Sequence, residues 1–119
     1  MSAVLQNNRG KIIYSDDCIS SLAGVTTTEC YGVVGMSSQK ATDGIVQLLK
    51  GENLKKGVIV KTDNSDVVTI DLFIIVEYGV SIAAVASSII QTVKYKVEKA
   101  TGLNVKQVNV MVNGIRVQN

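Results

Sequence analysis

The residue types that most often perform chemistry in proteins are few and widely spaced in this sequence of 119 residues. It contains no His, which excludes Ser-His and Cys-His nucleophiles, an imidazole general base and a His-ligated metal. Its two cysteines, Cys18 and Cys30, match no metal-binding or redox spacing. On one helix they would point about 120° apart, so we expect two buried, reduced, apolar side chains. The sequence therefore predicts no catalytic residue, no metal site and no cofactor.

Two short segments resemble binding motifs but fit a structural role better. The segment Asp63–Asp66 offers carboxylate and amide oxygens, which are the ligands that Ca²⁺ prefers. It lacks the spacing of a calcium loop, and Ile74 stands where the final Glu of that loop belongs, so the pattern favours a turn between strands. Gly32–Gly35 matches the GXXG loop of KH-type RNA binders, which joins two helices. Its two central valines favour a buried strand instead.

The composition is that of one folded domain. Hydrophobic residues make up 46% of the chain and charged residues 18%, with a net charge of +2. These values exclude wholesale disorder and give no support to nucleic-acid binding by charge alone. The start of the chain lacks a secretory signal pattern, and the strand-to-helix break within the apolar window Leu72–Ile90 disfavours a membrane span. We therefore predict a cytoplasmic protein with a single domain over residues 1–119 and a flexible segment at 1–8.

The hydrophobic pattern predicts an α+β fold, in which a small, mostly antiparallel sheet has helices packed on one face. The predicted order is β-α-β-(α)-β-β-α-β, and Ser15 and Gly102 are the expected caps of the first and last helices. The short middle helix is expected to stop at Gly51. Strands are expected at Gly10–Tyr14, Gly32–Met36, Val58–Thr62, Val67–Tyr78 and Val108–Val112, and helices at Asp16–Cys30, around Ile45–Leu49, and at Ser81–Thr101.

The long helix has an unusual distribution of charge, because nothing from Val80 to Val93 is charged. An apolar stripe at helical spacing consists of Ile82, Ala86, Ile89, Val93, Val97 and Ala100. The opposite face carries Ala84, Ser88, Gln91 and Tyr95. Small, neutral side chains let another surface approach closely. This face is predicted either to bind a second copy or a partner protein, or to lie under a further layer of the same chain.

Several segments of the sequence carry a resemblance to a known family. They are Gly10–Ile12, the helix start Ser15–Asp17, Gly32–Met36, Lys56–Val58, Asp71–Ile82 and Thr101–Val110. In this order they resemble the alkaline shock protein family, the Gls-type envelope stress response proteins of Gram-positive bacteria. The chain length is similar to that of the small, single-domain, YloU-like members. The resemblance implies a non-enzymatic cytoplasmic protein, held near the membrane by an anchor partner, with no catalytic residue. Members usually carry charges along the first half of the long helix, so the neutral face is a departure.

Two further sets of residues are candidates for a surface role. Glu77 and Tyr78 form either a recognition surface or part of a tight turn at Gly79, in which Tyr78 covers the core. Three lysines near the middle of the chain form either a patch for anionic lipid headgroups or an ordinary solvated loop. These lysines are Lys50, Lys55 and Lys56.

The sequence thus predicts an interaction or scaffold protein linked to cell-envelope stress, which forms a homo-oligomer or docks to a membrane-anchored protein partner. The expected interaction surface consists of Glu77, Tyr78, Ala84, Ser88, Gln91 and Tyr95. Two alternatives stay open. One is an RNA-associated α/β module, which would need a basic stripe that the scattered lysines do not form. The other is a regulatory partner of a lipid or small-molecule kinase.

Overall fold

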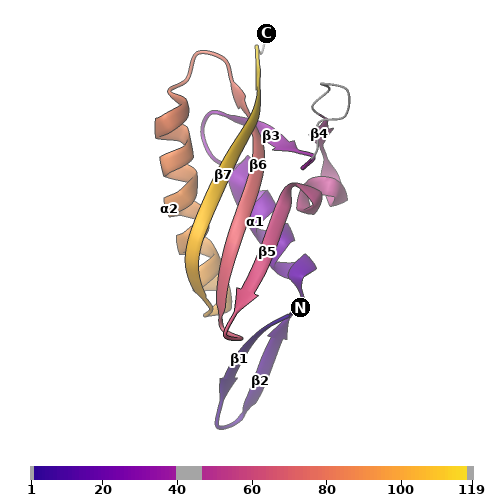
Figure 1. Ribbon diagram of the computed structural model, residues 1–119, viewed down its shortest axis with the longest axis vertical. Helices are drawn as coiled ribbons and strands as arrows, with labels where there is room; N and C mark the ends of the chain where they lie inside the picture. Colours follow the sequence, from indigo (N-terminus) through magenta and orange to yellow (C-terminus); the bar gives the residue numbers. More distant parts are fainter. Residues whose placement is uncertain (1, 40–46, 118–119) are drawn as a thin grey trace.

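The computed structural model describes residues 2–39 and 47–117 and confirms the α+β fold (Figure 1). The strands are β1 (Ala3–Asn7), β2 (Gly10–Tyr14), β3 (Val33–Ser37), β4 (Leu48–Leu49), β5 (Val58–Asp63), β6 (Val67–Glu77) and β7 (Asn104–Arg116). The helices are α1 (Asp16–Thr28), the 3-10 helix η1 (Gly51–Gly57) and α2 (Ile82–Thr101). β1 and β2 form a separate hairpin, and the other strands form one sheet that is antiparallel except for the β6–β7 pair.

β6 is the central strand of the main sheet. One of its edges pairs in parallel with β7 along its whole length, from Val67 opposite Asn104 to Glu77 opposite Arg116. The other edge is shared, because β5 pairs with the first part of β6 and β3 pairs with the part around Ile74–Val76. The sequence of β6 suits this place, since apolar residues on both of its faces are buried.

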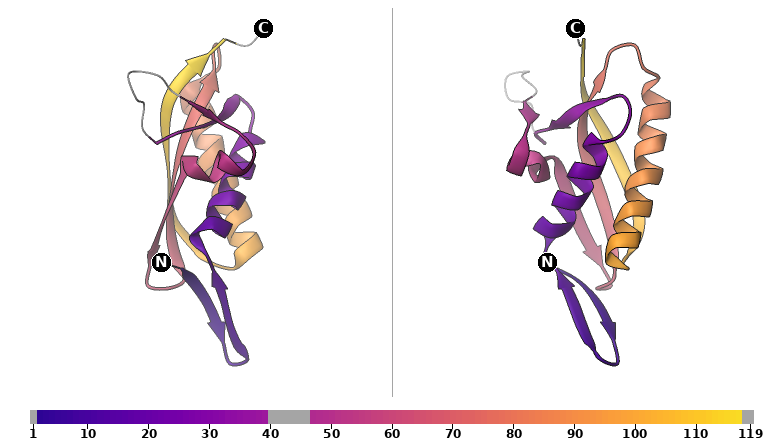
Figure 2. Two further views of the ribbon diagram at one scale, coloured as in Figure 1. Left: turned by 90° about the vertical axis from the view of Figure 1, so that its right-hand side faces the viewer. Right: turned by 180° about the vertical axis from the view of Figure 1, so that it is seen from behind.

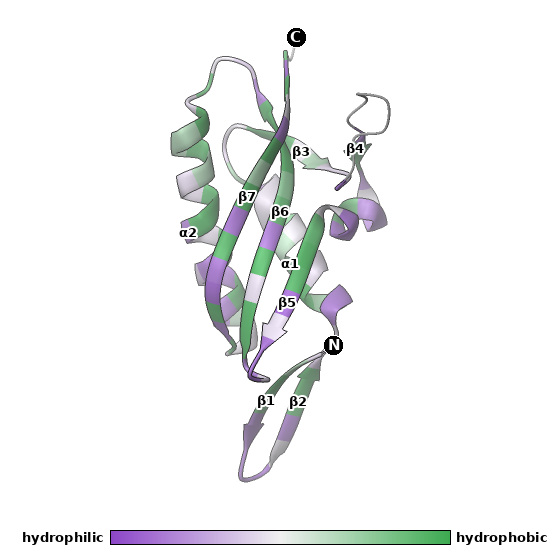
Figure 3. Ribbon diagram, in the orientation of Figure 1, coloured by the Kyte–Doolittle hydropathy of each residue, from purple (hydrophilic) through white to green (hydrophobic). Residues whose placement is uncertain are grey.

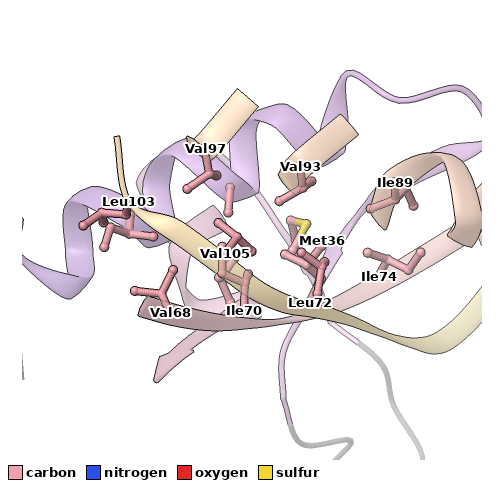
Figure 4. Close-up of a cluster of buried hydrophobic side chains, with 14 of the residues drawn as sticks. Met36, Val68, Ile70, Leu72, Ile74, Ile89, Val93, Val97, Leu103 and Val105 are labelled. Atoms are coloured by element: carbon pink, nitrogen blue, oxygen red, sulfur yellow. The ribbon is translucent and has the colours of Figure 1, made fainter. Parts of the chain in front are cut away.

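Both long helices lie on the same face of the sheet, as the two views in Figure 2 show. α2 runs alongside β7, and α1 lies next to it over β3 and β5. The core fills the space between the helices and the sheet. In Figure 4, Ile89 of α2 faces Ile74 of β6, and Val97 lies close to Val105 of β7. This arrangement confirms the predicted layer of helices on one face of a mostly antiparallel sheet.

Local sequence signals set the helix boundaries. The Ser15 hydroxyl accepts a hydrogen bond from the Cys18 N–H at 3.1 Å and begins α1 as predicted. α1 ends at Thr28, two residues before the predicted Cys30. Gly102 closes α2 in the left-handed conformation with a φ of 78°, and its N–H donates to the Glu98 carbonyl.

The buried face of α2 differs from the predicted stripe at its ends. Ile82 is 36% exposed, Ala86 is half-buried and Ala100 is exposed. The predicted stripe mixed steps of three and four residues, whereas the observed row uses steps of four only. Such a row is inclined to the helix axis and so follows a twisted sheet. The buried residues are Val85, Ile89, Val93, Val97 and Thr101.

The N-terminal hairpin includes a strand, β1, that the sequence did not predict. We expected a flexible segment at 1–8 and no element before Gly10, where Gln6–Arg9 is polar. β1 nevertheless pairs with β2, and the Val4 N–H donates to the Ser65 carbonyl at 2.8 Å. The Tyr14 hydroxyl also donates to the Thr101 carbonyl at 2.9 Å. These contacts attach the hairpin to the β5–β6 turn and to the end of α2.

The prediction for the segment after β3 was wrong. Leu48 and Leu49 form β4, which pairs with Ser37 and Met36 of β3, rather than part of an α-helix. Gly51 begins η1 instead of ending a helix, and Ile45 lies outside the described residues. A short apolar run does not distinguish a helix from a strand by its period. β7 is also longer than the predicted Val108–Val112 and runs parallel to β6.

Candidate functional site

The turn between β6 and α2 holds the first two predicted surface residues. The Glu77 N–H donates to the Gly32 carbonyl at 2.9 Å, and the Tyr78 N–H donates to the Arg116 carbonyl at 2.8 Å. Gly79 has a φ of 97°, which L-residues rarely adopt, so the turn is tight as expected. The Tyr78 side chain is 69% exposed and does not cover the core.

A cleft of about 310 Å³ lies between the start of α2 and the turn that joins α1 to β3. It contains two of the predicted residues on α2, and none of its lining side chains is charged. Tyr31 forms its other wall and is 82% exposed. The residues that line the cleft are Tyr31, Gly79, Val80, Ser81, Ala84, Val85 and Ser88.

Gly32 sets how closely the two walls of the cleft approach each other. Its φ is 84°, and a Cβ atom at this position would lie 2.6 Å from Cγ2 of Val85. Only a residue without a side chain lets the α1–β3 turn rest against α2 at this distance. Val85 is 4% exposed, so the contact joins the floor of the cleft to the core.

Sequence reasoning missed Tyr31. The residue follows α1 and stands directly before a glycine in a connection between two elements, and exposed aromatic residues in connections often serve binding. That signal was present in the sequence. Its proximity to Ala84 and Ser88 depends on the packing of α1 against α2, which no local pattern reveals.

Gln91 and Tyr95 do not line the cleft, although both are exposed. At 100° per residue they share the helix face of Ala84 and Ser88, but they lie further along α2, beyond the residues that face Tyr31. The Lys99 ammonium lies 5.6 Å from the centre of the Tyr95 ring. The predicted surface is therefore divided along α2 into a cleft-lining part at the start of the helix, Ala84 and Ser88, and a part further along the same face, Gln91 and Tyr95.

The three candidate lysines lie around η1, on the opposite side of the molecule from α2 (Figure 1). The Lys55 ammonium is 3.1 Å from the Asp17 carboxylate of α1, so part of its charge is neutralised. Lys50 and Lys56 are exposed, and the Lys56 carbonyl accepts a hydrogen bond from the Gln39 side chain. The structure thus gathers two exposed lysines and one ion pair at this end of α1, well apart from the cleft.

The segments that resembled binding motifs have structural roles. Asn64 and Ser65, with φ values of 46° and 57°, form the tight turn between β5 and β6. Val33 and Gly35 belong to β3, so the GXXG segment is a strand rather than a loop between two helices. Within residues 2–39 and 47–117, no group of three or more His, Cys, Asp or Glu side chains could hold a metal ion.

The cysteines correct one part of the prediction. Cys18 is exposed rather than buried, because it lies on the side of α1 that faces solvent, and Cys30 is half-buried. Burial raises the pKa of the Cys30 thiol, an effect that the nearby Lys96 ammonium opposes. Both thiols are free. In the part of the chain that the structure describes, no helix has the length and apolar character to span a bilayer.

The chain matches the model of a protein family that is described as having a cell envelope-related function. That model matches residues 4–117, so the chain belongs to the alkaline shock protein 23 family. The family includes the Gls24-type proteins, in agreement with the resemblance seen in the sequence.

Individual relatives are found in Gram-positive bacteria. The chain is 40% identical to "Uncharacterized protein YloU" of Bacillus subtilis, with 100% of this chain and 99% of that protein aligned. It is 38% identical to "Uncharacterized protein Spy1614" of Streptococcus pyogenes, over 98% and 97% of the two chains. A "Stress response regulator gls24 homolog" of S. pyogenes is 28% identical over 92% of this chain and 61% of its own length. No solved structure matches the chain.

Proposed function

We propose that this protein is a non-enzymatic interaction module with a cell envelope-related role, and that it binds a partner protein at the cleft between Tyr31 and α2. The observation that carries the proposal is the cleft itself. Exposed Tyr31 stands opposite a neutral, small-residue helix flank that contains Ala84 and Ser88, and exposed Tyr78 directly precedes Gly79 of the cleft lining. Tyrosine is enriched and charged residues are depleted at the centres of protein interfaces.

The chemistry of the cleft indicates what kind of partner segment it takes. Its lining is uncharged, so a charged group entering it would lose hydration without gaining an ion pair. Its volume of about 310 Å³ is at the lower limit for a small-molecule pocket. It suits one or two apolar side chains of a polypeptide segment, and exposed Tyr31 at its wall offers a hydroxyl to polar groups of that segment.

The cell envelope-related description of the family supports an envelope-associated protein as the proposed partner. Because no described helix can span a bilayer, we propose that contact with the envelope is made through a protein that is itself anchored there. The element η1, which carries the three candidate lysines at its ends, lies on the opposite side of the molecule from α2 (Figure 1). Lys50 and Lys56 can therefore contact an anionic surface while a partner occupies the cleft. In this proposal the lysine contact is weaker than the contact at the cleft.

In vivo photo-crosslinking of the full chain tests the proposal. A benzophenone amino acid replaces Tyr31, and the matched control carries it at Ile13, which is 64% exposed on the distant β1–β2 hairpin. We expect position 31, and not position 13, to yield an adduct with one envelope-associated protein. The purified partner should then bind the unlabelled chain, and Ser88→Glu should weaken that binding by about tenfold or more because it places a charge in the cleft.

Three results would overturn the proposal. One is the same set of adducts at both positions. Another is an adduct at position 31 whose formation Ser88→Glu leaves unchanged. The third is a combination of two observations: the crosslinker at position 31 captures no protein, and the chain binds RNA in a salt-dependent way in a filter titration that Ser88→Glu leaves unchanged. This result would favour the RNA-associated alternative.

A further inference from the structure

The outer edge of β7 is an unpaired strand edge. β7 pairs with β6 on one side, and no strand of the described chain lies along its other side. An exposed edge offers N–H and C=O groups to any strand that meets it, so proteins usually protect edges with charges, prolines or bulges. The protection of β7 is confined to its ends. The Glu98 carboxylate accepts the Val105 N–H at 3.0 Å, and Lys106 follows directly.

The middle of β7 is regular and neutral. Register shifts occur next to Lys106 and Asn113, and between them Gln107–Val112 pairs with Thr69–Ile74 of β6 without interruption. No residue from 107 to 115 is charged, and the chain contains no Pro. Six consecutive residues are thus available for edge pairing, with none of the usual obstacles.

The flank of α2 next to this edge is apolar and exposed. Ile82 and Ile90 are 36% and 37% exposed, and Val112 and Ile115 of β7 are 36% and 52% exposed. Ile82 and Ile90 lie on the side of α2 away from the cleft, since Ala84 and Ser88 occupy the other flank. Figure 3 shows that the strongly hydrophilic residues of α2 lie in the middle and the C-terminal half of the helix, not at its start.

These four side chains lie at matching heights along the helix and the strand. The Tyr78 N–H donates to the Arg116 carbonyl, which brings the end of β7 to the start of α2 and therefore Ile115 towards Ile82. Ile89 faces Ile74 in Figure 4, and Ile74 is the register partner of Val112, so Ile90 lies at the height of Val112. Helix and strand together border the free edge with one apolar strip.

We infer that the outer edge of β7 pairs antiparallel with β7 of a second copy of this chain, which extends the sheet across a two-fold axis. A two-fold contact brings the same patch of both copies together, so a charged patch would meet a patch of its own charge. The neutral strip avoids this repulsion. Opposite residues of antiparallel strands share a face, and Val108, Val110 and Val112 of one copy therefore meet the same valines of the other. The two α2 helices then cover the exposed isoleucines on the helix side.

This inference stands on residues outside the cleft and is tested separately from the proposed function. The measurement is the molar mass of the purified full chain by light scattering and sedimentation over a range of concentrations. We expect a dimer that dissociates on dilution. Ile90→Lys should weaken the dimer by about tenfold or more, because each copy would bring an ammonium group into the apolar strip that the dimer buries. Ser88→Lys, which adds the same charge on the cleft flank, should leave the dimer unchanged.

A second measurement keeps the test independent of how well a variant folds. In hydrogen exchange on the unmodified chain, the amides of Gln107–Val112 that point away from β6 should become protected as concentration rises. A chain that stays monomeric at its highest soluble concentration overturns the inference. So does a dimer that Ser88→Lys dissociates and Ile90→Lys preserves, or one that forms without added protection in β7.

Discussion

Replacing Gly32 with alanine tests the contact that closes the cleft against the core. The new Cβ would lie 2.6 Å from Val85 Cγ2 and 3.6 Å from Val80 Cγ1. Val85 is buried and β-branched on a helix, so it has one strongly preferred rotamer and little freedom to turn away. Overpacking of this kind costs about 1–3 kcal/mol. The φ of 84° adds about 1–2 kcal/mol for a residue with a side chain. The free energy of unfolding should therefore fall by about 2–5 kcal/mol.

Urea denaturation followed by circular dichroism measures this loss, with Gly79→Ala as the matched control. Gly79 has a similar φ of 97°, but a Cβ there would meet nothing within 4 Å. The control thus carries the backbone strain and the change in unfolded-state entropy without the clash. We expect Gly32→Ala to lower the urea midpoint by about 1 M or more beyond the control. Equal midpoints for the two variants would show that the close approach to Val85 does not limit the stability of the fold.

Two further predictions concern the end of α2 and the cysteines. Thr101 Oγ1 accepts the Leu103 N–H at 3.1 Å and donates to the Val97 carbonyl at 2.7 Å. Because Thr101→Val removes both hydrogen bonds, it should lower the free energy of unfolding by about 1–3 kcal/mol. Thr101→Ser keeps the hydroxyl and should restore most of this free energy, as measured by urea titration. A valine variant as stable as the serine variant would contradict this. For the thiols, a soluble maleimide at about pH 8 should label exposed Cys18 first, because burial raises the pKa of Cys30 and lowers its thiolate fraction at that pH. Raising the pH should speed the labelling of Cys30, and a fast phase that survives Cys18→Ser would refute the assignment.

The elements that the sequence predicted well are those set by local chemistry. Ser15 and Gly102 cap their helices as expected, since a hydroxyl that accepts an N–H and a residue that tolerates positive φ act within a few positions. The turn at Asp63–Asp66 and the two-sided apolar strand β6 were recognised for the same reason. Each depends on neighbours in the chain rather than on packing.

The features that the sequence did not predict depend on contacts between distant segments. The parallel course of β7 follows from the return of the chain after α2, and β4 exists only because Leu48 and Leu49 reach the edge of β3. The candidate surface likewise combines residues that local sequence predicts with one that only packing brings into place. Ala84 and Ser88 were identified from helical spacing, whereas Tyr31 joins them only through the packing of the two helices.

The central position of β6 has a consequence for how the chain folds as the ribosome makes it. β3 and β5 are synthesised before their common partner, so neither has its place in the main sheet until Val67–Glu77 has emerged. α1 has until then only part of the surface on which it packs. Pairings between distant segments slow folding and prolong the exposure of apolar side chains. We expect the nascent chain that ends shortly before β6 to be the form most dependent on chaperones.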